Sequence, residues 1–411
     1  MDKFNSRKVD IFNEIEQSSS SSHSKRVLYS KLELLRLDVQ ESDLSDVVIA
    51  DFEKDLDDKV QLLNIGYVTS QGGLLYSVDE FLRLLVVWQI LFTGALLFSI
   101  PLLILKFSDG VLNRFGLPSV YMPTAAVTKL LLSRTILLVS GVKLVVEDLK
   151  QDYFKPSCTL ACFSHASTLD AFILGAAVPV ATCSLAKKEL FLIPFFSSLL
   201  FAYGGVPVDR KNRAAAVISL EIAASSGNCI TIAPEGTRSL TGQLLPFKKG
   251  AFHMWEQLQV PILPIVIVGA HDLLPPGRSM AVPGVVYVRF LAPIQPSEAR
   301  SRGDMQRLLR RRMLESLQQS PLDASRPLSL SERLFSFLSL STSAGVCTGI
   351  LIIAYQQAVR HFTFREIALW GFCLSVASTI LIYIYAVYVQ QWIFSWGNKK
   401  KRVVSKTLKG D

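Results

Sequence analysis

Long uninterrupted apolar runs mark both halves of the chain. Within residues 84–105 the only strongly polar side chain is Gln89, and about 20 apolar residues suffice to cross the hydrocarbon core of a membrane as a helix. Two further uncharged apolar runs, residues 335–355 and 367–389, are joined by a short link near the C-terminus. The pattern predicts one membrane helix early in the chain and a helical hairpin late in it.

A third apolar stretch, residues 124–146, differs because it carries Lys129, Arg134 and Lys143. Each charge at mid-bilayer costs roughly 2.5 to 3.5 kcal/mol on insertion scales. We therefore expect this stretch to lie at the membrane interface. A re-entrant hairpin that pairs it with residues 84–105 is an alternative, and it changes the side of the membrane on which the N-terminal region lies.

The N-terminal region shows no pattern typical of a catalytic domain. Residues 1–26 contain a serine run and few large apolar side chains, which predicts a flexible tail. Residues 27–37 fit an amphipathic helix, but no chemistry is evident in residues 27–77.

The middle of the chain has a different pattern of hydrophobic and polar residues. Short β-rich runs at 159–164, 229–234, 260–268 and 285–291 alternate with helical patterns at 214–225 and 251–259. This alternation predicts an α/β domain over residues 150–298.

Composition and charge agree with a protein that meets lipid. Half of the residues are hydrophobic and mean hydropathy is +0.35. The net charge of +9 suits partners that carry phosphate, which include anionic lipids, coenzyme A and nucleic acid. Arginines between positions 300 and 312 and the basic run 399–402 flank the predicted hairpin and place both flanks on the cytoplasmic side. The six cysteines lack a CxxC pair or a zinc-like spacing, so we expect reduced thiols.

The first candidate for chemistry is HASTLD, from His165 to Asp170, which follows directly on an apolar run. Five residues along a regular helix would turn the two side chains roughly 140° apart, but a strand-to-helix turn lets them meet. The carboxylate would then orient the imidazole and leave its other nitrogen as a base. The spacing alone is weak support, because His361 and Glu366 repeat it between two predicted membrane helices.

Three further segments between residues 187 and 250 combine cations with apolar surroundings. APEGTRS holds Glu235, Gly236, Thr237 and Arg238, and a simple turn with a Glu–Arg ion pair explains it equally well. The stretch from Lys187 to Arg210 brackets an apolar segment with basic groups, as a lipid phosphate site or a buried helix would. The run FKKGAF adds two lysines that suit either a phosphate site or a solvated face.

The order of these motifs within about 100 residues resembles the glycerolipid acyltransferase family, most closely the 1-acylglycerol-3-phosphate acyltransferases. The resemblance covers residues 140–295 and four ordered blocks: the His–Asp pair, Gly205 to Arg210, the EGTR block and the apolar run 260–265. Ser164 and Ala233 depart from the asparagine and phenylalanine that are usual in the family.

The resemblance implies an acyl transfer from acyl-CoA to the sn-2 hydroxyl of a lysophosphatidate, as a step of phospholipid biosynthesis at the endoplasmic reticulum. His165 would act as base and Asp170 would orient it. The acceptor phosphate would be bound by Lys187, Arg210 and Arg238, with Glu235, Gly236 and Thr237 shaping the pocket. Acyl-CoA, a lysophospholipid and the bilayer are the implied partners, with no nucleic acid, no cofactor and no metal.

Alternatives remain within and outside this class. The acceptor could be lysophosphatidylcholine, lysophosphatidylethanolamine or glycerol 3-phosphate. A membrane protein that binds lipid without turning it over is a different class, and a hydrolase is disfavoured because there is no GxSxG motif.

The expected organisation follows from the patterns and the resemblance together. An N-terminal region (1–77), partly disordered, precedes a membrane helix and an interfacial helix (78–149). An acyltransferase-type catalytic α/β domain around a mostly parallel sheet (150–298) faces the cytosol. A basic linker (299–333), a transmembrane hairpin (334–394) and a basic cytosolic tail (395–411) complete the chain.

Overall fold

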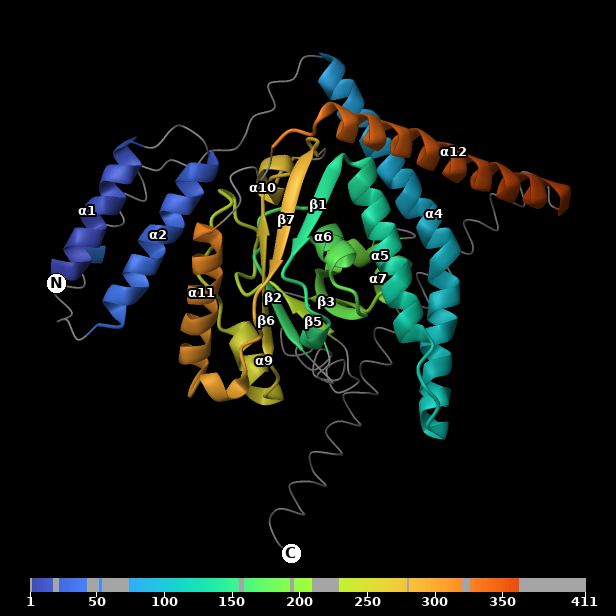
Figure 1. The fold of residues 1–411 in the computed structure, drawn as a ribbon. Coiled ribbons are helices and arrows are strands. Elements are labelled where there is room, and N and C mark those ends of the chain that lie inside the picture. The colour runs from blue at the N-terminus through green and yellow to red at the C-terminus, as the bar shows by residue number, and fades with distance from the viewer. Residues whose placement is uncertain are drawn as a thin grey trace, which may run out of the picture.

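The computed structural model describes residues 2–17, 22–42, 52–53, 74–154, 159–192, 196–208, 229–278, 281–319 and 326–361. Within these ranges a mixed sheet forms the centre of the molecule (Figure 1), in the order β1-β7-β6-β2-β5-β3-β4. Neighbouring strands run parallel except β6 and β7, which are antiparallel. The prediction of an α/β domain with a mostly parallel sheet is confirmed. The strands are β1 (Val142–Glu147), β2 (Leu160–Phe163), β3 (Thr182–Lys187), β4 (Gly205–Val208), β5 (Cys229–Ile232), β6 (Ile262–Val268) and β7 (Gly284–Phe290).

Two separate apolar cores cover the two faces of the sheet. Successive side chains of a strand point to opposite faces, and β2 shows this directly: Leu160 and Cys162 belong to one core and Ala161 to the other. Every residue of β6 is buried, which explains its unbroken apolar sequence. Cys162, Cys183 and Cys229 are buried thiols, as expected.

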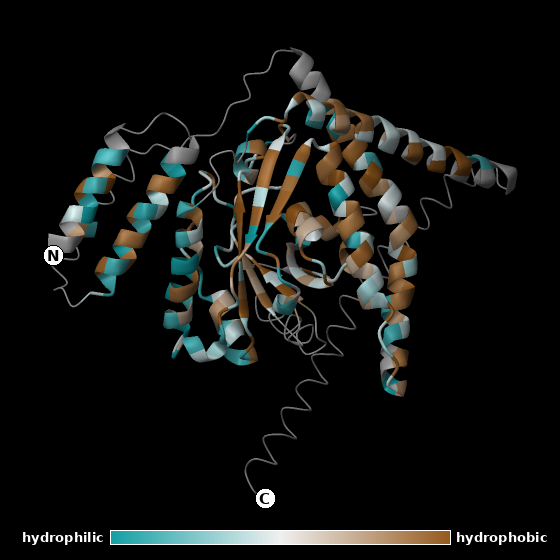
Figure 2. Cartoon of the chain, in the orientation of Figure 1, coloured by the Kyte–Doolittle hydropathy of each residue, from teal (hydrophilic) through white to brown (hydrophobic). Residues whose placement is uncertain are grey.

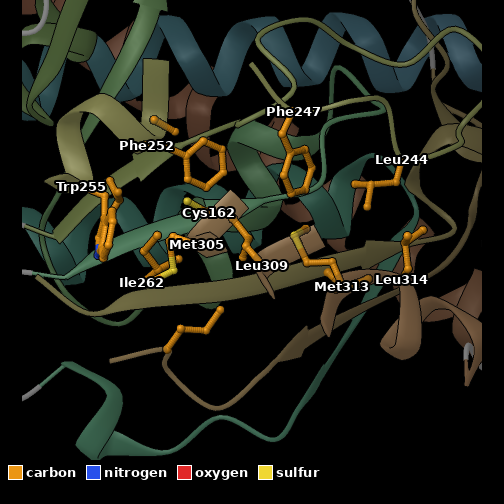
Figure 3. Close-up of a cluster of buried hydrophobic side chains, with 14 of the residues drawn as sticks. Cys162, Leu244, Phe247, Phe252, Trp255, Ile262, Met305, Leu309, Met313 and Leu314 are labelled. Atoms are coloured by element: carbon orange, nitrogen blue, oxygen red, sulfur yellow. The ribbon is translucent and has the colours of Figure 1, made fainter. Parts of the chain in front are cut away.

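The first core lies under α9 (Gly250–Leu258) and α11 (Arg302–Gln318). Figure 3 shows how Met305, Leu309 and Met313 of α11 meet Phe252 of α9 and the loop residue Phe247. Residues 302–318, assigned from sequence to a basic linker, are therefore part of the packed domain. This corrects the interpretation of the arginine cluster, because apolar residues between the arginines give α11 a face that packs on the sheet.

The second core lies under α5 (Tyr121–Val139) and α6 (Asp170–Ala177), with α4 (Leu74–Leu112), α7 (Phe196–Ala202) and α12 (Leu330–His361) packed outside them. Figure 2 shows the apolar character of these helices. By length and composition, two helices among the described residues are suited to crossing a membrane: Phe81–Asp109 within α4, and α5. Residues 335–355 lie within α12, whereas 367–389 and 395–411 fall outside the described residues.

The expectation for residues 124–146 needs correction. The helix ends at Val139, Gly141 adopts φ +75°, and β1 begins at Val142. Lys129 is buried, and its Nζ donates to the backbone oxygen of Val180, after α6, at 2.8 Å. The charge that argued against a membrane position thus bonds to protein.

The N-terminal region is also more ordered than expected. Residues 2–17, predicted as a flexible tail, form α1 (Asp2–Gln17), and α2 (Ser22–Gln40) contains the amphipathic helix predicted at 27–37. Ile11 of α1 packs against Leu28, Leu32 and Leu35 of α2, and this small core explains why α1 forms. Figure 1 shows α2 beside α11 and α1 on the outer side of α2, both away from α4 and α5.

The short helices connect these layers. The pattern predicted at 251–259 corresponds to α9, and the one predicted at 214–225 lies outside the described residues. The short elements are η1 (Asn113–Phe115), η2 (Gln151–Phe154), η3 (Lys188–Leu192), α10 (Ala270–Leu273) and η4 (Pro296–Glu298).

Candidate active site

The predicted motifs gather at one edge of the sheet. Strands β2, β5, β3 and β4 are parallel neighbours, so their carboxyl ends share an edge, which is where open α/β sheets place their ligands. His165 follows the end of β2, Glu235 follows the end of β5, and Lys187 is the last residue of β3. This shared edge joins motifs that lie up to 70 residues apart.

His165 and Asp170 meet as the turn geometry requires. Nδ1 of His165 lies 2.7 Å from Oδ2 of Asp170, which begins α6. The same oxygen accepts the backbone N–H groups of Ala166 and Ser167 at 3.0 and 2.9 Å. Asp170 is 1% exposed, whereas the side chain of His165 is 27% exposed. With Nδ1 donating to a fixed carboxylate, Nε2 is the nitrogen that can take a proton from a bound hydroxyl.

Glu235 ties the EGTR turn to the histidine. Its Oε1 accepts the backbone N–H of His165 at 2.7 Å, and its Oε2 accepts the N–H of Leu245 at 2.8 Å. In return, the N–H of Ser239 donates to the carbonyl of His165 at 2.8 Å. Burial raises the pKa of Glu235 to about 8, although both backbone N–H bonds act to lower it. Glu235 therefore links two backbone segments through hydrogen bonds. It does so instead of forming the ion pair with Arg238 that a simple turn would have.

Two cations border this turn. The guanidinium of Arg238 donates to the hydroxyl of Thr168, within the HASTLD turn itself. Gly236 adopts φ +68°, and a side chain there would meet Lys248, whose Cδ lies 2.8 Å from an added Cβ. Arg238, Lys248 and Thr237, which precedes Arg238, are exposed, so a mobile anion can reach them. The site thus combines a partly exposed imidazole, held by a buried carboxylate, with accessible positive charge.

The other predicted phosphate ligands are placed less completely. The backbone of Lys187 pairs with that of Val208 in β4, at the same edge as the motifs above. Arg210 lies outside the described residues. The described residues of the apolar stretch between them form η3, α7 and β4, rather than one buried helix.

Comparison with known proteins assigns the domain that carries this geometry. The family model described as Acyltransferase matches residues 147–268, which contain every one of the motifs above. Residues 147–268 are an acyltransferase-family domain.

Three curated relatives of this acyltransferase domain share the same name. A 1-acyl-sn-glycerol-3-phosphate acyltransferase of Saccharomyces cerevisiae is 38% identical over 146 residues, which are 34% of this chain and 48% of the relative. A protein of the same name from Cocos nucifera is 35% identical over 33% of this chain and 45% of its own length, and one from Haemophilus influenzae is 36% identical over 30% and 52%. The chain spans about half the length of the curated relatives it matches.

Among solved structures, the 1-acyl-sn-glycerophosphate acyltransferase PlsC of Thermotoga maritima is similar over 59% of this chain and 97% of its own, with 22% sequence identity and a TM-score of 0.43.

Two details of the acyltransferase domain were not evident from sequence. Ser164 is buried, and its hydroxyl accepts the N–H of Ile267 at 2.9 Å, so the departure from asparagine leaves a bonded turn. Leu245, which supplies a backbone donor to Glu235, has no polar side chain that a motif search would find. Only the backbone geometry reveals it.

Proposed function

We propose that this protein transfers a fatty acyl chain from acyl-CoA to the sn-2 hydroxyl of 1-acyl-sn-glycerol 3-phosphate and so forms phosphatidate. The observation that carries the proposal is the 2.7 Å contact between His165 Nδ1 and Asp170 Oδ2, with the ring exposed beside accessible cations. The names of the curated relatives support the same acceptor.

In the proposed reaction the acceptor hydroxyl loses its proton to Nε2 of His165 as its oxygen attacks the thioester carbonyl carbon. The negative charge of Asp170 stabilises the imidazolium that forms. The tetrahedral intermediate then collapses, the carbon–sulfur bond breaks, and the CoA thiolate leaves with the proton returned by His165. A thiolate is a good leaving group, so the site mainly supplies a base and fixed geometry.

The acceptor phosphate is assigned to the cations that border the EGTR turn. Arg238 lies over the turn that holds the base, and Lys248 lies beside Gly236. Guanidinium groups suit bidentate phosphate contacts. We propose that Lys187, at the end of β3, and Arg210, which follows β4 in the sequence, complete this set.

We also assign α4 and α5 to the membrane. Large apolar side chains of α4 such as Phe81, Ile100 and Ile104 are more than half exposed, and an exposed apolar surface of this length is matched by lipid rather than water. The proposed location is the endoplasmic reticulum, with the catalytic domain on the cytosolic side. Protease protection of an N-terminal tag in sealed microsomes tests that orientation.

The mechanism is tested with His165→Ala in the full-length protein in membranes. Loss of a general base costs about 10² to 10⁴ in rate, so we expect product formation from labelled acyl-CoA to fall by about 10³-fold. His253→Ala is the matched control, because His253 is an exposed histidine of α9 in the same domain. Activity of His165→Ala close to that of His253→Ala would refute the proposed base.

The acceptor is tested by offering the purified protein acyl-CoA with lysophosphatidate, lysophosphatidylcholine, lysophosphatidylethanolamine or glycerol 3-phosphate. We expect lysophosphatidate to have the highest kcat/KM. A higher value for another acceptor would retain the acyl transfer and overturn the assigned substrate, whereas no transfer to any acceptor would overturn both.

A further inference from the structure

The loop that follows the EGTR turn runs between the catalytic edge and helices outside the family-matched segment. Its side chains Leu244 and Phe247 are anchored in the core beneath α9 and α11, as Figure 3 shows. Its backbone faces Arg310 of α11, which is 8% exposed. Nη1 of Arg310 donates to the carbonyl of Leu245 at 2.7 Å and lies 3.5 Å from that of Leu244.

Arg310 is itself held on two further sides. Its Nη2 donates to Oε2 of Glu33 in α2 at 2.6 Å, and Glu33 is likewise buried. Its guanidinium carbon lies 5.6 Å from the centre of the Phe247 ring, which it overlies. A buried charge with this many fixed contacts has little freedom to move, because breaking any one leaves polar groups unpaired away from water.

These contacts continue to the proposed base without a break. Leu245 receives Arg310 at its carbonyl and donates its N–H to Oε2 of Glu235. The other oxygen of Glu235 receives the N–H of His165. A side chain of α2 is therefore joined to the backbone of the catalytic turn through four hydrogen bonds in series.

Helix α2 contacts the same loop along one face. Arg26, Tyr29 and Glu33 are spaced by three and four residues, which places them on one stripe of a helix. Nε of Arg26 donates to the carbonyl of Thr241 at 3.2 Å, and the hydroxyl of Tyr29 lies 3.4 Å from the carbonyl of Leu244. Along this stripe, Arg26 and Tyr29 contact the loop directly, and Glu33 contacts it through Arg310.

We propose that Arg310, held by Glu33, is a positioning residue that fixes His165 by holding the carbonyl of Leu245, so that α2 and α11 form part of the support of the active site. The expected effect on kcat rests on the proposed acyl transfer, whereas the expected effect on hydrogen exchange does not. The positive charge of Arg310 also acts to lower the pKa of Glu235, which favours the carboxylate that accepts both backbone N–H groups.

The chain offers a close control in the next residue. Arg311 also joins α11 to the end of α2, through Asp38 and the following Glu41, and both of these ion pairs go to acids rather than to the loop. Removing Arg311 therefore weakens the same helix pair and leaves the carbonyl of Leu245 with its donor. The comparison of Arg310→Met with Arg311→Met separates positioning of the loop from attachment of α2.

The first readout is independent of activity. In wild-type protein the amides of His165 and Leu245 are hydrogen-bonded, and their hydrogen exchange, followed by mass spectrometry of peptides spanning 160–170 and 240–250, reports the bonds to Glu235. We expect Arg310→Met to speed exchange in both peptides and Arg311→Met to speed it in neither. Equal exchange in the two variants would overturn the proposal.

The second readout is kinetic. We expect Arg310→Met to lower kcat about tenfold, since a base displaced by a fraction of an ångström loses its alignment, with KM for acyl-CoA within about twofold of wild type. Arg310→Lys, which keeps a charged donor, should recover part of this loss of kcat. Glu33→Gln should lower kcat by a smaller factor than Arg310→Met does. A folded Arg310→Met variant with wild-type kcat, or no recovery by lysine, would contradict the assignment.

Two safeguards keep the outcomes distinct. If Arg310→Met does not fold, Glu33→Gln and Arg310→Lys are compared with Arg311→Met, and equal kcat in all three counts against positioning. If wild-type protein transfers no acyl chain, the proposed function fails, while the exchange experiment still decides whether Arg310 holds the catalytic turn.

Discussion

The helical layers on the two sides of the sheet differ in the character of their side chains. The α4 and α5 layer turns large apolar side chains outward, and its buried Lys129 donates to the backbone carbonyl of Val180. The α2 and α11 layer is joined by ion pairs, in which Arg310 meets Glu33 and Arg311 meets Asp38. This contrast supports the proposal that α4 and α5 face lipid, whereas in the other layer Arg310 holds the loop that follows the EGTR turn.

The largest effect is expected where the apolar layer is given charge. Ile100 and Ile104 are 61% and 62% exposed on α4, and replacing both with Asp adds two charges at roughly 2.5 to 3.5 kcal/mol each if they face lipid. We expect a glycosylation reporter carrying residues 81–109 to insert into microsomes before the change and to remain largely uninserted after it.

A reporter carrying residues 302–318, from the ion-paired layer, serves as the control and should stay uninserted. Unchanged insertion of the doubly substituted α4 segment would remove the distinction between the layers.

An intermediate effect is expected at Glu235, where the loop braced by α11 meets the catalytic turn. Its pKa is about 4.5 in the unfolded chain and about 8 in the folded one, so between these values the folded protein holds a proton that the unfolded chain releases. Raising the pH from 5 to 8 therefore favours unfolding, by about 3 kcal/mol at this group.

Thermal unfolding of wild type and Glu235→Gln across that pH range measures this difference. The wild-type midpoint should fall relative to that of the variant as pH rises, because glutamine does not titrate. Parallel curves for the two proteins would show that Glu235 does not carry the linkage.

The smallest effect is expected at Arg311, in the ion-paired layer itself. Its bonds to Asp38 and Glu41 are partly exposed, and pairs of this kind contribute about 0 to 1 kcal/mol and are screened by salt. Arg311→Met should lower the free energy of unfolding, measured by denaturant titration, by no more than about 1 kcal/mol. This loss should be smaller at about 0.5 M NaCl than at about 0.05 M, because the Debye length is about 10 Å near 0.1 M and shortens as salt rises. A larger, salt-independent loss would assign Arg311 a structural role like that of Arg310.

The catalytic turn was predictable because its geometry is local. The apolar run before His165 predicted a strand, the five-residue spacing excluded a regular helix, and β2, the turn and α6 follow that order. The same spacing at His361 and Glu366 has no such context, since His361 ends the long helix α12. What distinguishes the two pairs is the preceding strand rather than the residues themselves.

The arginine cluster shows where sequence reasoning failed. Its charge density is typical of a membrane flank, but five of its members form ion pairs, among them Arg310 with Glu33, Arg311 with Asp38, and Arg312 with Glu298. A charge pattern records which groups are cationic and nothing about the distant acids that neutralise them. The partners of Arg310 and Arg311 lie more than 270 residues away in the chain.

The sequence by itself determined four of the strands (β2, β5, β6 and β7), the order of the motifs and the contact between His165 and Asp170, because alternation, turns and short spacings act over a few residues. Only the tertiary structure decided that Lys129 bonds to protein, that Leu245 donates to Glu235, and that Arg310 bonds to Glu33 of α2. Those contacts depend on how separate elements pack, and backbone donors and distant ion pairs leave no mark in the residue pattern.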